Sequence, residues 1–465
     1  MVKLFDRLAH YPNGRNGHGD VPFDEALADY RLACISRAID DREIALRQQS
    51  QVFFQISGAG HEALLLGLAR SLRAGYDWFF PYYRDRALVL GLGVTPLEIL
   101  LQAVGSADDP ASGGRQMPCH WGDAERNIVS QSSPTGSQCL PAVGCAEAGR
   151  YIVGRDLPGC TAHGDEVTYV SLGEGACSEG EFWESLNTAC RLGLPVLYVV
   201  ADNGYAISVR ASDQAPAPVS EMVMGIRGLH VTQIDGRDYF EVRTRGAEAI
   251  QRVRAGQGPG LIHATVTRPY SHSLSDDQKK YRAAEELEDE AEHDPIQLLE
   301  QELVRLGVLT PADAQEVRAE ANEIVADAAK QALAAARPDP ESISHHLVGP
   351  RPVTEVPPDP PAAGEPVAFG ESIRLTLHEE MARDERIRVF GEDVADAREA
   401  LLADLEGKGG VFGTTYGLQR RFGQARCYNT PLAEANIIGR AVGQALRGLR
   451  PAPEIQFFDY IWPAM

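Results

Sequence analysis

The chain has 465 residues, of which 24% are charged and 44% are hydrophobic, and its formal net charge at pH 7 is −22. This length exceeds that of one ordinary domain, so we expect at least two globular domains. The negative charge argues against binding to nucleic acid or to an anionic membrane surface. The sequence shows no apolar run of membrane-spanning length and no secretory signal, and its eight cysteines are scattered, so we expect a reducing, cytoplasmic location.

The first 150 residues are expected to be mainly helical. Residues 1–28 are predicted to form a mobile extension, and helices with a polar interruption follow to about Leu72. A loop rich in Gly, Ser and Pro spans residues 104–135, and long loops in compact enzymes are often functional. A further helix is predicted from Gln138 to about Val153.

The most specific pattern in the chain is a strand–helix–strand unit. Two strand-like apolar runs, Val167–Leu172 and Leu194–Val200, flank an amphipathic helix predicted over residues 179–191. Such a unit forms a right-handed parallel crossover. Glu174 and Asn203 follow the two strands, so both are expected at the carboxyl edge of the sheet, where open α/β sheets bind ligands.

The residue types at this edge suit a metal-bound phosphate. A carboxylate and an amide oxygen are ligands for a hard cation such as Mg²⁺, which also takes phosphate oxygens. Gly173 and Gly175 let the backbone approach a phosphate, and the helix start near Ser178 offers free N–H groups. A GEG triplet by itself is usually a structural turn, but the whole pattern with DNGYAIS favours a magnesium–diphosphate site.

The pattern continues with a strand over 230–235, a helix over 238–255 and a strand over 260–268. An acidic run at 285–294 is typical of a solvated helix face. Helices dense in Ala, Glu and Leu extend to residue 336.

The composition changes sharply after these helices. Residues 337–366 contain nine prolines and few apolar residues, which predicts an extended linker between a domain at 29–336 and a second α/β domain at 367–465. In the second domain, 387–394 is expected to be a strand that runs into a Gly-Glu-Asp turn, and 453–462 a strand that runs into a loop. With about 100 residues it lies at the low end of domain size, so we expect it to be incomplete.

The GEG and DNGYAIS motifs resemble the metal and diphosphate motif of thiamine-diphosphate enzymes. More narrowly, they resemble the alpha subunit of the branched-chain 2-oxo acid dehydrogenase decarboxylating component. The resemblance implies a thiamine-diphosphate-binding fold, a parallel sheet flanked by helices, with Mg²⁺ held by Glu174, Asn203 and the Tyr205 carbonyl. Ala201 stands where branched-chain enzymes place an arginine near the diphosphate, so Arg84 is expected to carry more of the phosphate charge.

Two further segments share the resemblance. In PYYRDRAL, an arginine and a tyrosine hydroxyl can both bond to a phosphate, and the resemblance assigns Tyr83 and Arg84 to the diphosphate. In SSPTGSQ it implies that Ser133 and Thr135 hold the aminopyrimidine, with Thr135 replacing the usual leucine. The remaining residues expected at the cofactor are Gly173, Glu174, Gly175 and Ala176. A potassium ion, bound nearby in some relatives, would correspond to Ser132, Pro134, Ser137 and Gln138.

The segment RPYSHSLSDDQKKYR follows the end of a predicted strand. A histidine among Ser and Asp at such an edge can move protons or orient a substrate, although a lone histidine there often has no such role. The resemblance makes His272 the active-site histidine, near the cofactor and the incoming lipoyl group, and Asp276 a brace for the loop.

Residues 367–465 resemble the N-terminal part of the family's beta subunit, through FGEDV, YNTPLAEANIIG and EIQFFDYIWPA. The resemblance implies that Glu434 hydrogen-bonds the aminopyrimidine ring and that Gln456 and Tyr460 lie on the cofactor side. On position alone, Glu434 is equally well explained as an acid stabilised at a helix N-terminus. The chain is therefore expected to join an alpha-like part to an incomplete, pyrimidine-binding beta-like part.

The resemblance implies oxidative decarboxylation of branched-chain 2-oxo acids, such as 3-methyl-2-oxobutanoate, in branched-chain amino acid catabolism. The enzyme would be an oxidoreductase that transfers the acyl group to the lipoyl domain of a dihydrolipoyl acyltransferase within a multienzyme complex, and self-association is expected. Two alternatives stay open. The chain could act on pyruvate or acetoin, or it could be a cofactor-binding but inactive truncated fragment.

Overall fold

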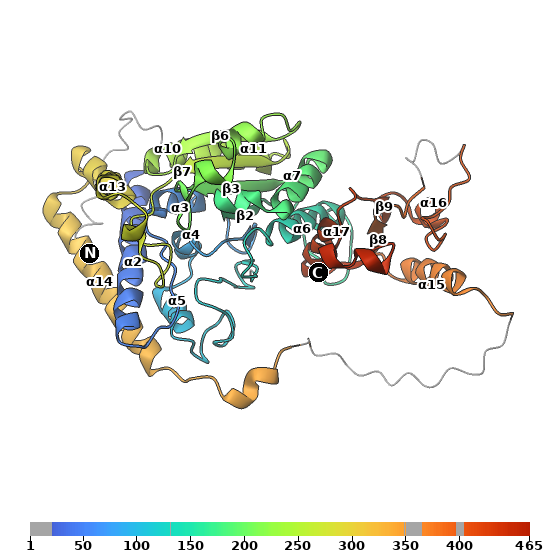
Figure 1. Cartoon of the computed structure of the whole chain (residues 1–465), viewed down its shortest axis with the longest axis horizontal. Coiled ribbons are helices and arrows are strands. Elements are labelled where there is room, and N and C mark those ends of the chain that lie inside the picture. Colours follow the sequence, from blue (N-terminus) through green and yellow to red (C-terminus); the bar gives the residue numbers. More distant parts are fainter. Residues whose placement is uncertain (1–20, 131, 348, 350–364, 397–403) are drawn as a thin grey trace. The chain divides into compact units, whose positions relative to one another are not determined.

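A computed structural model describes residues 21–347, 349, 365–396 and 404–465, except residue 131 (Figure 1). The chain divides into two compact units, one of Met1–Ala146 with His163–Pro338 and one of Glu147–Ala162 with Asp339–Met465. Most of the predicted N-terminal extension and the central part of the predicted linker lie outside the described residues. The predicted domain boundaries therefore stay predictions.

The first unit is built on a five-stranded parallel sheet with the strand order β1-β2-β3-β7-β6. The strands are β1 (Trp78–Phe80), β2 (Thr168–Gly173), β3 (Val196–Asp202), β6 (His230–Asp235) and β7 (Gly260–Thr265). Strands β2 and β3 are buried along nearly their whole length, as expected for a parallel sheet covered on both faces. The predicted parallel α/β fold is confirmed.

Helices cover both faces of this sheet, and successive residues of β3 point into two different cores. Leu197 and Val199 belong to one core, while Tyr198 and Val200 belong to the other. The first core is formed with α2 (Phe23–Gln48), α3 (Glu62–Ala69), α4 (Arg86–Gly91), α5 (Pro96–Ala103), α10 (Tyr239–Glu241), α11 (Ala247–Arg254), α13 (Pro295–Arg305) and α14 (Pro311–Ala334). The second is formed with α6 (Cys139–Ile152), α7 (Gly180–Leu192) and α9 (Val219–Met222).

Short elements complete the first unit. They are the hairpin strands β4 (Tyr205–Ala206) and β5 (Val209–Arg210), α8 (Ala211–Gln214), α12 (Ala284–Glu292), a π-helical turn at Val242–Gly246, and 3-10 turns at Gly175–Ser178 and Gln278–Lys280. A 3-10 turn at Pro340–Ser344 belongs to the second unit. The helix predicted over 179–191 is α7, and it ends at Gly193, whose left-handed backbone is typical of a helix C-terminus.

The first helix starts earlier than predicted. Helix α2 begins at Phe23, inside the segment 1–28 that was expected to be a mobile extension. Asp24 and Glu25 lie in its first turn, where acidic side chains interact favourably with the positive end of the helix dipole. Ala26 and Leu27 are buried in the first core. Burial of these two side chains explains why the helix extends past the predicted start.

The second unit has a three-stranded parallel sheet in the order β10-β8-β9. Its elements are α15 (Phe369–Arg383), β8 (Ile387–Gly391), α16 (Leu418–Phe422), β9 (Cys427–Asn429), α17 (Glu434–Leu446), β10 (Arg450–Glu454) and 3-10 turns at Phe458–Tyr460 and Trp462–Ala464. Met381, Val389 and Leu418 pack on one face of the sheet, and Phe390 and Ile437 pack on the other. The predicted second, smaller α/β domain is confirmed.

A buried ion-pair network joins residues 147–162 to the rest of the second unit. The carboxylate of Glu147 accepts hydrogen bonds from Arg440 at 2.7 and 3.0 Å, from Arg388 at 3.2 Å and from Gln444 at 3.2 Å. Burial raises the pKa of Glu147, but Arg440 and Arg388 outweigh that effect and hold it at about 2. The acid is therefore ionised in the folded unit at neutral pH.

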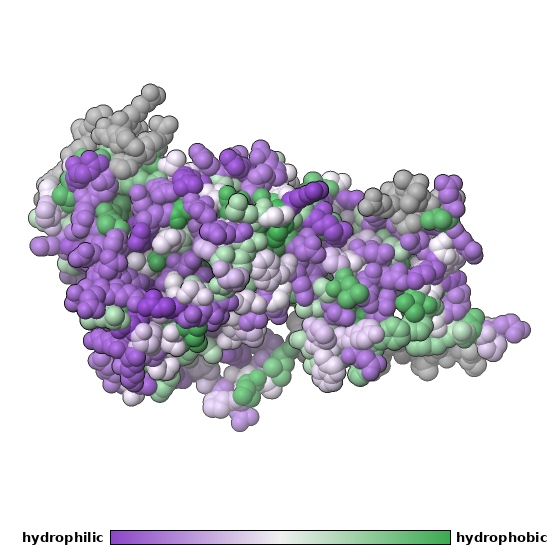
Figure 2. Space-filling model, turned by 45° about the horizontal axis from the view of Figure 1, so that its top comes forward, coloured by the Kyte–Doolittle hydropathy of each residue, from purple (hydrophilic) through white to green (hydrophobic). Residues whose placement is uncertain are grey.

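Hydrophilic residues predominate on the face of the molecule drawn in Figure 2, with hydrophobic residues in smaller groups. In the second unit, Leu432, Phe458 and Trp462 have exposed fractions of 77%, 84% and 72%.

Within the described ranges, no helix has both the length and the hydrophobicity needed to cross a membrane.

Replacing Glu147 with alanine should destabilise the second unit by about 3 kcal/mol, because two buried guanidinium groups lose their carboxylate. Hydrogen exchange of the α17 amides in the full chain should then be about 100-fold faster. As a control, Glu380→Ala, which breaks an exposed ion pair with Arg383, should change exchange little. The parent unit should also lose stability as pH falls below 4.5 toward 2, because the folded-state pKa of Glu147 is lowered. Unchanged protection of α17 would refute this role.

Candidate functional site

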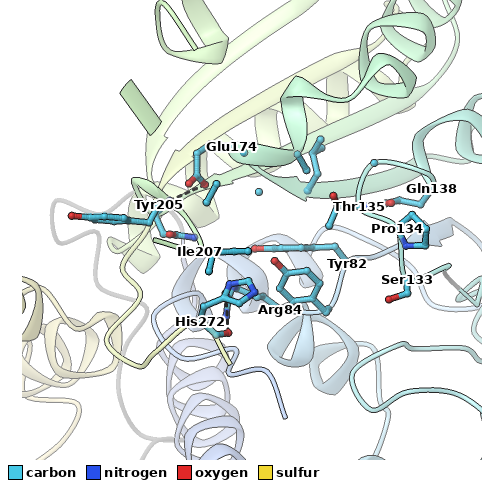
Figure 3. A pocket seen from close by; sticks show the side chains of 18 of the residues that line it. Tyr82, Arg84, Ser133, Pro134, Thr135, Gln138, Glu174, Tyr205, Ile207 and His272 are labelled. Carbon is cyan, nitrogen blue, oxygen red and sulfur yellow. Dashed lines mark hydrogen bonds between the residues drawn. The ribbon is translucent and has the colours of Figure 1, made fainter. Parts of the chain in front are cut away.

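The carboxyl ends of β2 and β3 meet at one edge of the first unit's sheet, where a pocket opens (Figure 3). The two strands are parallel neighbours, with Gly173 paired to Ala201. Glu174 and Asn203 follow these residues, and the Asn203 N–H donates to the Glu174 carboxylate at 3.3 Å. The predicted crossover therefore brings the two side chains together.

The pocket has a volume of about 260 Å³ and gathers residues from five separate segments of the first unit. Its lining consists of Tyr82, Tyr83, Arg84, Ser132, Ser133, Pro134, Thr135, Gly136, Gln138, Leu172, Gly173, Glu174, Gly175, Ala176, Asn203, Tyr205, Ala206, Ile207 and His272. Every site residue predicted in the first unit is among them except Ser137, whose hydroxyl donates to the Pro134 carbonyl at 2.7 Å. The structure thus joins motifs that lie up to 190 residues apart (Tyr82 to His272) in one cavity.

One end of the pocket presents oxygen atoms that lack partners. Glu174 Oε1 and Asn203 Oδ1 are both buried, and neither has a hydrogen-bond partner among the described residues. Burial, and then the charge of Asp202, raises the pKa of Glu174 to about 7. Unpartnered buried oxygens of this kind fit a divalent cation, because a cation would compensate both.

The backbone around these oxygens is closely packed. A Cβ atom at Gly175 would come within 2.5 Å of the Ala206 Cβ, so only glycine fits without displacing the 205–206 strand. Tyr205 is fixed from its side chain, since its hydroxyl donates to Glu286 at 3.1 Å and its ring lies 4.9 Å from the Arg282 guanidinium carbon. The Tyr205 carbonyl is thus carried by a restrained residue.

The same pocket contains a buried cation. Arg84 is 2% exposed and, among the described residues, has no ion-pair partner. Its guanidinium donates to the Ser57 carbonyl at 2.6 Å and to His272 Nδ1 at 3.1 Å, and it lies 5.1 Å from the centre of the Tyr83 ring. A buried arginine bonded only to neutral acceptors can bind an anion such as a phosphate.

His272 is held by the same arginine. Burial lowers the pKa of His272, and the charges of Arg84 and Arg268 lower it further, to about 4. The imidazole is therefore neutral near pH 7, and because Nδ1 accepts from Arg84, the ring proton lies on Nε2. The backbone N–H of His272 donates to the Asp276 carboxylate at 2.9 Å, so Asp276 braces this loop as predicted.

Sequence patterns did not single out Tyr82 or Ile207. Tyr82 is buried, and its N–H donates to the Ser171 hydroxyl at 3.1 Å. Ile207 is 54% exposed and has a φ of 58°, a conformation that is costly for a β-branched residue. The Ile207 carbonyl accepts from buried Arg268 at 2.8 Å, which helps hold this conformation. Ile207 is distinguished as a site residue only by its left-handed backbone conformation, which no pattern in the sequence predicts.

The second unit carries the other predicted site residues. Glu434 is the first residue of α17 and is half-buried. Burial raises the pKa of Glu392, and the nearby charge of Glu434 adds to that effect. Gln456 and Tyr460 follow β10, and Tyr460 packs on Phe457 with ring centres 5.5 Å apart. Because Gly391 pairs with Glu454, Glu392 and Gln456 leave the same edge of the second sheet.

Glu174→Gln should stabilise the metal-free protein at pH 8 by on the order of 1–3 kcal/mol. The folded-state pKa of Glu174 is raised from 4.5 to about 7, so its contribution to stability is lost as pH rises through that range. Below pH 4.5 the difference should vanish. Urea denaturation at several pH values measures this, with the exposed Glu221→Gln as control. A variant less stable than the parent at pH 8 would contradict the assignment.

Arg84→Gln should raise the pKa of His272 from about 4 toward its ordinary value of 6.5, because one of the two nearby positive charges is removed. Histidine NMR of the labelled full chain would follow this titration. Arg210→Gln, which removes an exposed arginine paired with Glu286, is the matched control and should leave the midpoint unchanged. An unshifted midpoint in the Arg84 variant would show that the two side chains are not in contact.

Both parts of the chain match known protein families. Residues 30–341 match the family described as "Dehydrogenase E1 component", and residues 365–465 match "Transketolase, pyrimidine binding domain". The pocket lies within the first match, and Glu434, Gln456 and Tyr460 lie within the second.

Individual relatives agree with the first match. The chain is 36% identical over 319 residues to the 2-oxoisovalerate dehydrogenase subunit alpha of Bacillus subtilis, covering 68% of this chain and 93% of that one. It is 33% identical over 322 residues to the 3-methyl-2-oxobutanoate dehydrogenase subunit alpha of Mycobacterium tuberculosis, covering 68% and 82%. It is 32% identical over 323 residues to the mitochondrial 2-oxoisovalerate dehydrogenase subunit alpha of Mus musculus, covering 69% and 70%.

The predicted resemblance is therefore confirmed. Membership of these families implies thiamine diphosphate as the cofactor and a multienzyme complex with a lipoyl acyltransferase as the setting. The chain belongs to the dehydrogenase E1 component family, as a 2-oxo acid dehydrogenase component whose alpha-like part is followed by a pyrimidine-binding domain that corresponds to the N-terminal part of a beta subunit.

Proposed function

We propose that this chain catalyses the oxidative decarboxylation of branched-chain 2-oxo acids, such as 3-methyl-2-oxobutanoate, and transfers the acyl group to the lipoyl domain of a dihydrolipoyl acyltransferase. The observation that carries the proposal is the pocket in which two oxygens and a buried arginine lie together, the oxygens without hydrogen-bond partners and the arginine without a carboxylate partner in the part of the chain that the structure describes. The names of the relatives, 2-oxoisovalerate and 3-methyl-2-oxobutanoate dehydrogenase, support the branched-chain substrate.

The residues present fit a metal-bound diphosphate. Glu174, Asn203 and the Tyr205 carbonyl would hold Mg²⁺, since their oxygens are the hard ligands that this ion takes. Arg84 and Tyr83 would bind the diphosphate, with Arg84 supplying the main positive charge. Ala201 is buried on β3 and adds no charge there, which increases the dependence on Arg84. When bound, thiamine diphosphate supplies an electron-accepting thiazolium ring, which lets a 2-oxo acid lose carbon dioxide.

His272, neutral near pH 7, would act as a hydrogen-bond donor through Nε2. Arg84 holds Nδ1, and the proton on Nε2 is free to bond to a substrate or lipoyl group. We assign Glu434 to the aminopyrimidine ring, which it would orient and protonate. The remaining assignments are Ser133, Thr135, Gly173, Gly175, Ala176, Gln456 and Tyr460 for the cofactor, and Ser132, Pro134, Ser137 and Gln138 for a potassium ion.

Turnover of a substrate panel by the full chain tests this proposal. With thiamine diphosphate, Mg²⁺ and an artificial electron acceptor, kcat/KM for 3-methyl-2-oxobutanoate should exceed that for pyruvate by about tenfold or more, because two extra methyl groups can be buried.

His272→Ala should retain cofactor binding but impair acyl transfer to a lipoyl domain.

The other outcomes separate the alternatives. A higher kcat/KM for pyruvate or acetoin would replace the branched-chain assignment with one of those substrates. Calorimetric binding of thiamine diphosphate without turnover of any substrate would instead identify a cofactor-binding, inactive protein. Glu174→Gln provides the matched background rate, because it keeps the size of the side chain and removes the charge that would hold the metal.

A further inference from the structure

A chain of four hydrogen-bonded side chains ends at Asp202, next to Asn203. Asp202 Oδ2 accepts from His263 Nε2 at 2.8 Å, and His263 Nδ1 lies 2.8 Å from the Ser220 hydroxyl. Gln233 donates to the same hydroxyl at 2.7 Å. In the neutral imidazole the donors therefore all point toward the Asp202 carboxylate.

The sheet register places these residues side by side. Val200 pairs with His263 across β3 and β7, and Gln233 pairs with His263 across β6 and β7. Ser220 is contributed by α9 and is 1% exposed, and the His263 side chain is 11% exposed. Asp202 is partly buried, with a side chain that is 23% exposed, and Gln233 is exposed. Because the His263–Ser220 centre of the array is buried, its hydrogen bonds favour one arrangement of these side chains.

Asp202 connects this array to the turn that follows β3. Its other oxygen, Oδ1, accepts the Gly204 N–H at 2.9 Å, and its backbone carbonyl accepts the Val266 N–H at 2.9 Å. Gly204 has a φ of 78°, so the chain reverses tightly here. Since one carboxylate oxygen bonds to the turn and the other to His263, the orientation of the turn depends on where His263 holds the carboxylate.

We propose that His263, acting through Asp202, is a positioning residue that fixes the turn carrying Asn203 Oδ1 and the Tyr205 carbonyl for metal binding. This inference rests on the proposed function. Neither His263 nor Asp202 lines the pocket, so neither is proposed as a ligand, and His263 acts on the site through Asp202 and the turn. Tyr205 is already restrained by Glu286, which leaves the Asn203 end of the turn dependent on the array.

Substitution of His263 in the full chain tests the proposal. His263→Leu removes the donor to Asp202 and should weaken Mn²⁺ binding, measured by electron paramagnetic resonance at saturating thiamine diphosphate, by about tenfold. The Mg²⁺ concentration for half-maximal activity should rise with kcat unchanged at saturating Mg²⁺. In the metal-free protein, the Gly204 amide should exchange faster. His263→Gln, which can still donate to Asp202, should restore Mn²⁺ affinity to within about threefold of the parent.

Two further variants complete the design. His230→Leu removes the histidine that starts β6 and bonds to the Gln257 carbonyl at 2.9 Å, away from the turn, and it should leave Mn²⁺ affinity unchanged. Ser220→Ala keeps His263 but removes its second contact, so it should give an intermediate weakening even if the leucine variant does not fold.

The results that overturn the proposal are distinct from those that overturn the function. A parent chain that binds Mn²⁺ with thiamine diphosphate, together with an unchanged affinity in His263→Leu or Ser220→Ala, refutes the positioning role alone. Equal weakening by the leucine and glutamine variants also refutes it, because the donor would then be irrelevant. A parent chain that binds neither Mn²⁺ nor thiamine diphosphate refutes the proposed function and this inference with it.

Discussion

The parallel pairing of β2 with β3 is the constraint on which the candidate site depends. Its register aligns Gly173 with Ala201, so that the residues after each strand reach the same edge together. A shift of one residue would turn the side chains to opposite faces of the sheet. The buried alternating side chains of β3 oppose such a shift, because Leu197 and Tyr198 belong to different cores. Packing far from the pocket thus sets the spacing of the polar atoms within it.

The pocket concentrates charges that a stable interior would avoid. Arg84 and the Oε1 atom of Glu174 are buried, and neither side chain has an ion-pair partner among the described residues. The surrounding structure contributes buried hydrogen bonds, such as those of Asp40, which accepts from Arg86, from Gln55 at 2.8 Å and from the Gly58 N–H at 3.1 Å. These bonds hold the loop whose Ser57 carbonyl anchors Arg84. Hydrogen bonds around the pocket therefore offset the energetic cost of the buried, unpaired charges within it, as is typical of functional sites.

Local sequence patterns predicted the elements whose structure depends on neighbouring residues. They failed for features whose structure depends on contacts between residues far apart in the sequence. The crossover, β6 and the GEG turn follow from apolar runs and glycines within about 40 residues. The early start of α2 depends on burial against helices far along the chain, which no local window contains. Ile207 is marked only by its backbone conformation, held by Arg268. Sequence patterns did not single out Glu147, because its partners lie 241 and 293 residues away.

The separation of Glu147 from its partners has a consequence for biosynthesis. Translation releases the segment 147–162 long before Arg388 and Arg440, although the folded second unit contains all three. Contacts over such distances in sequence form slowly, and domains otherwise tend to fold as they emerge. Until residue 440 has been synthesised, Glu147 therefore lacks at least one of the two arginine partners that it has in the folded second unit. Completion of the fold around residues 147–162 is therefore coupled to the synthesis of β8 and α17, which carry Arg388 and Arg440.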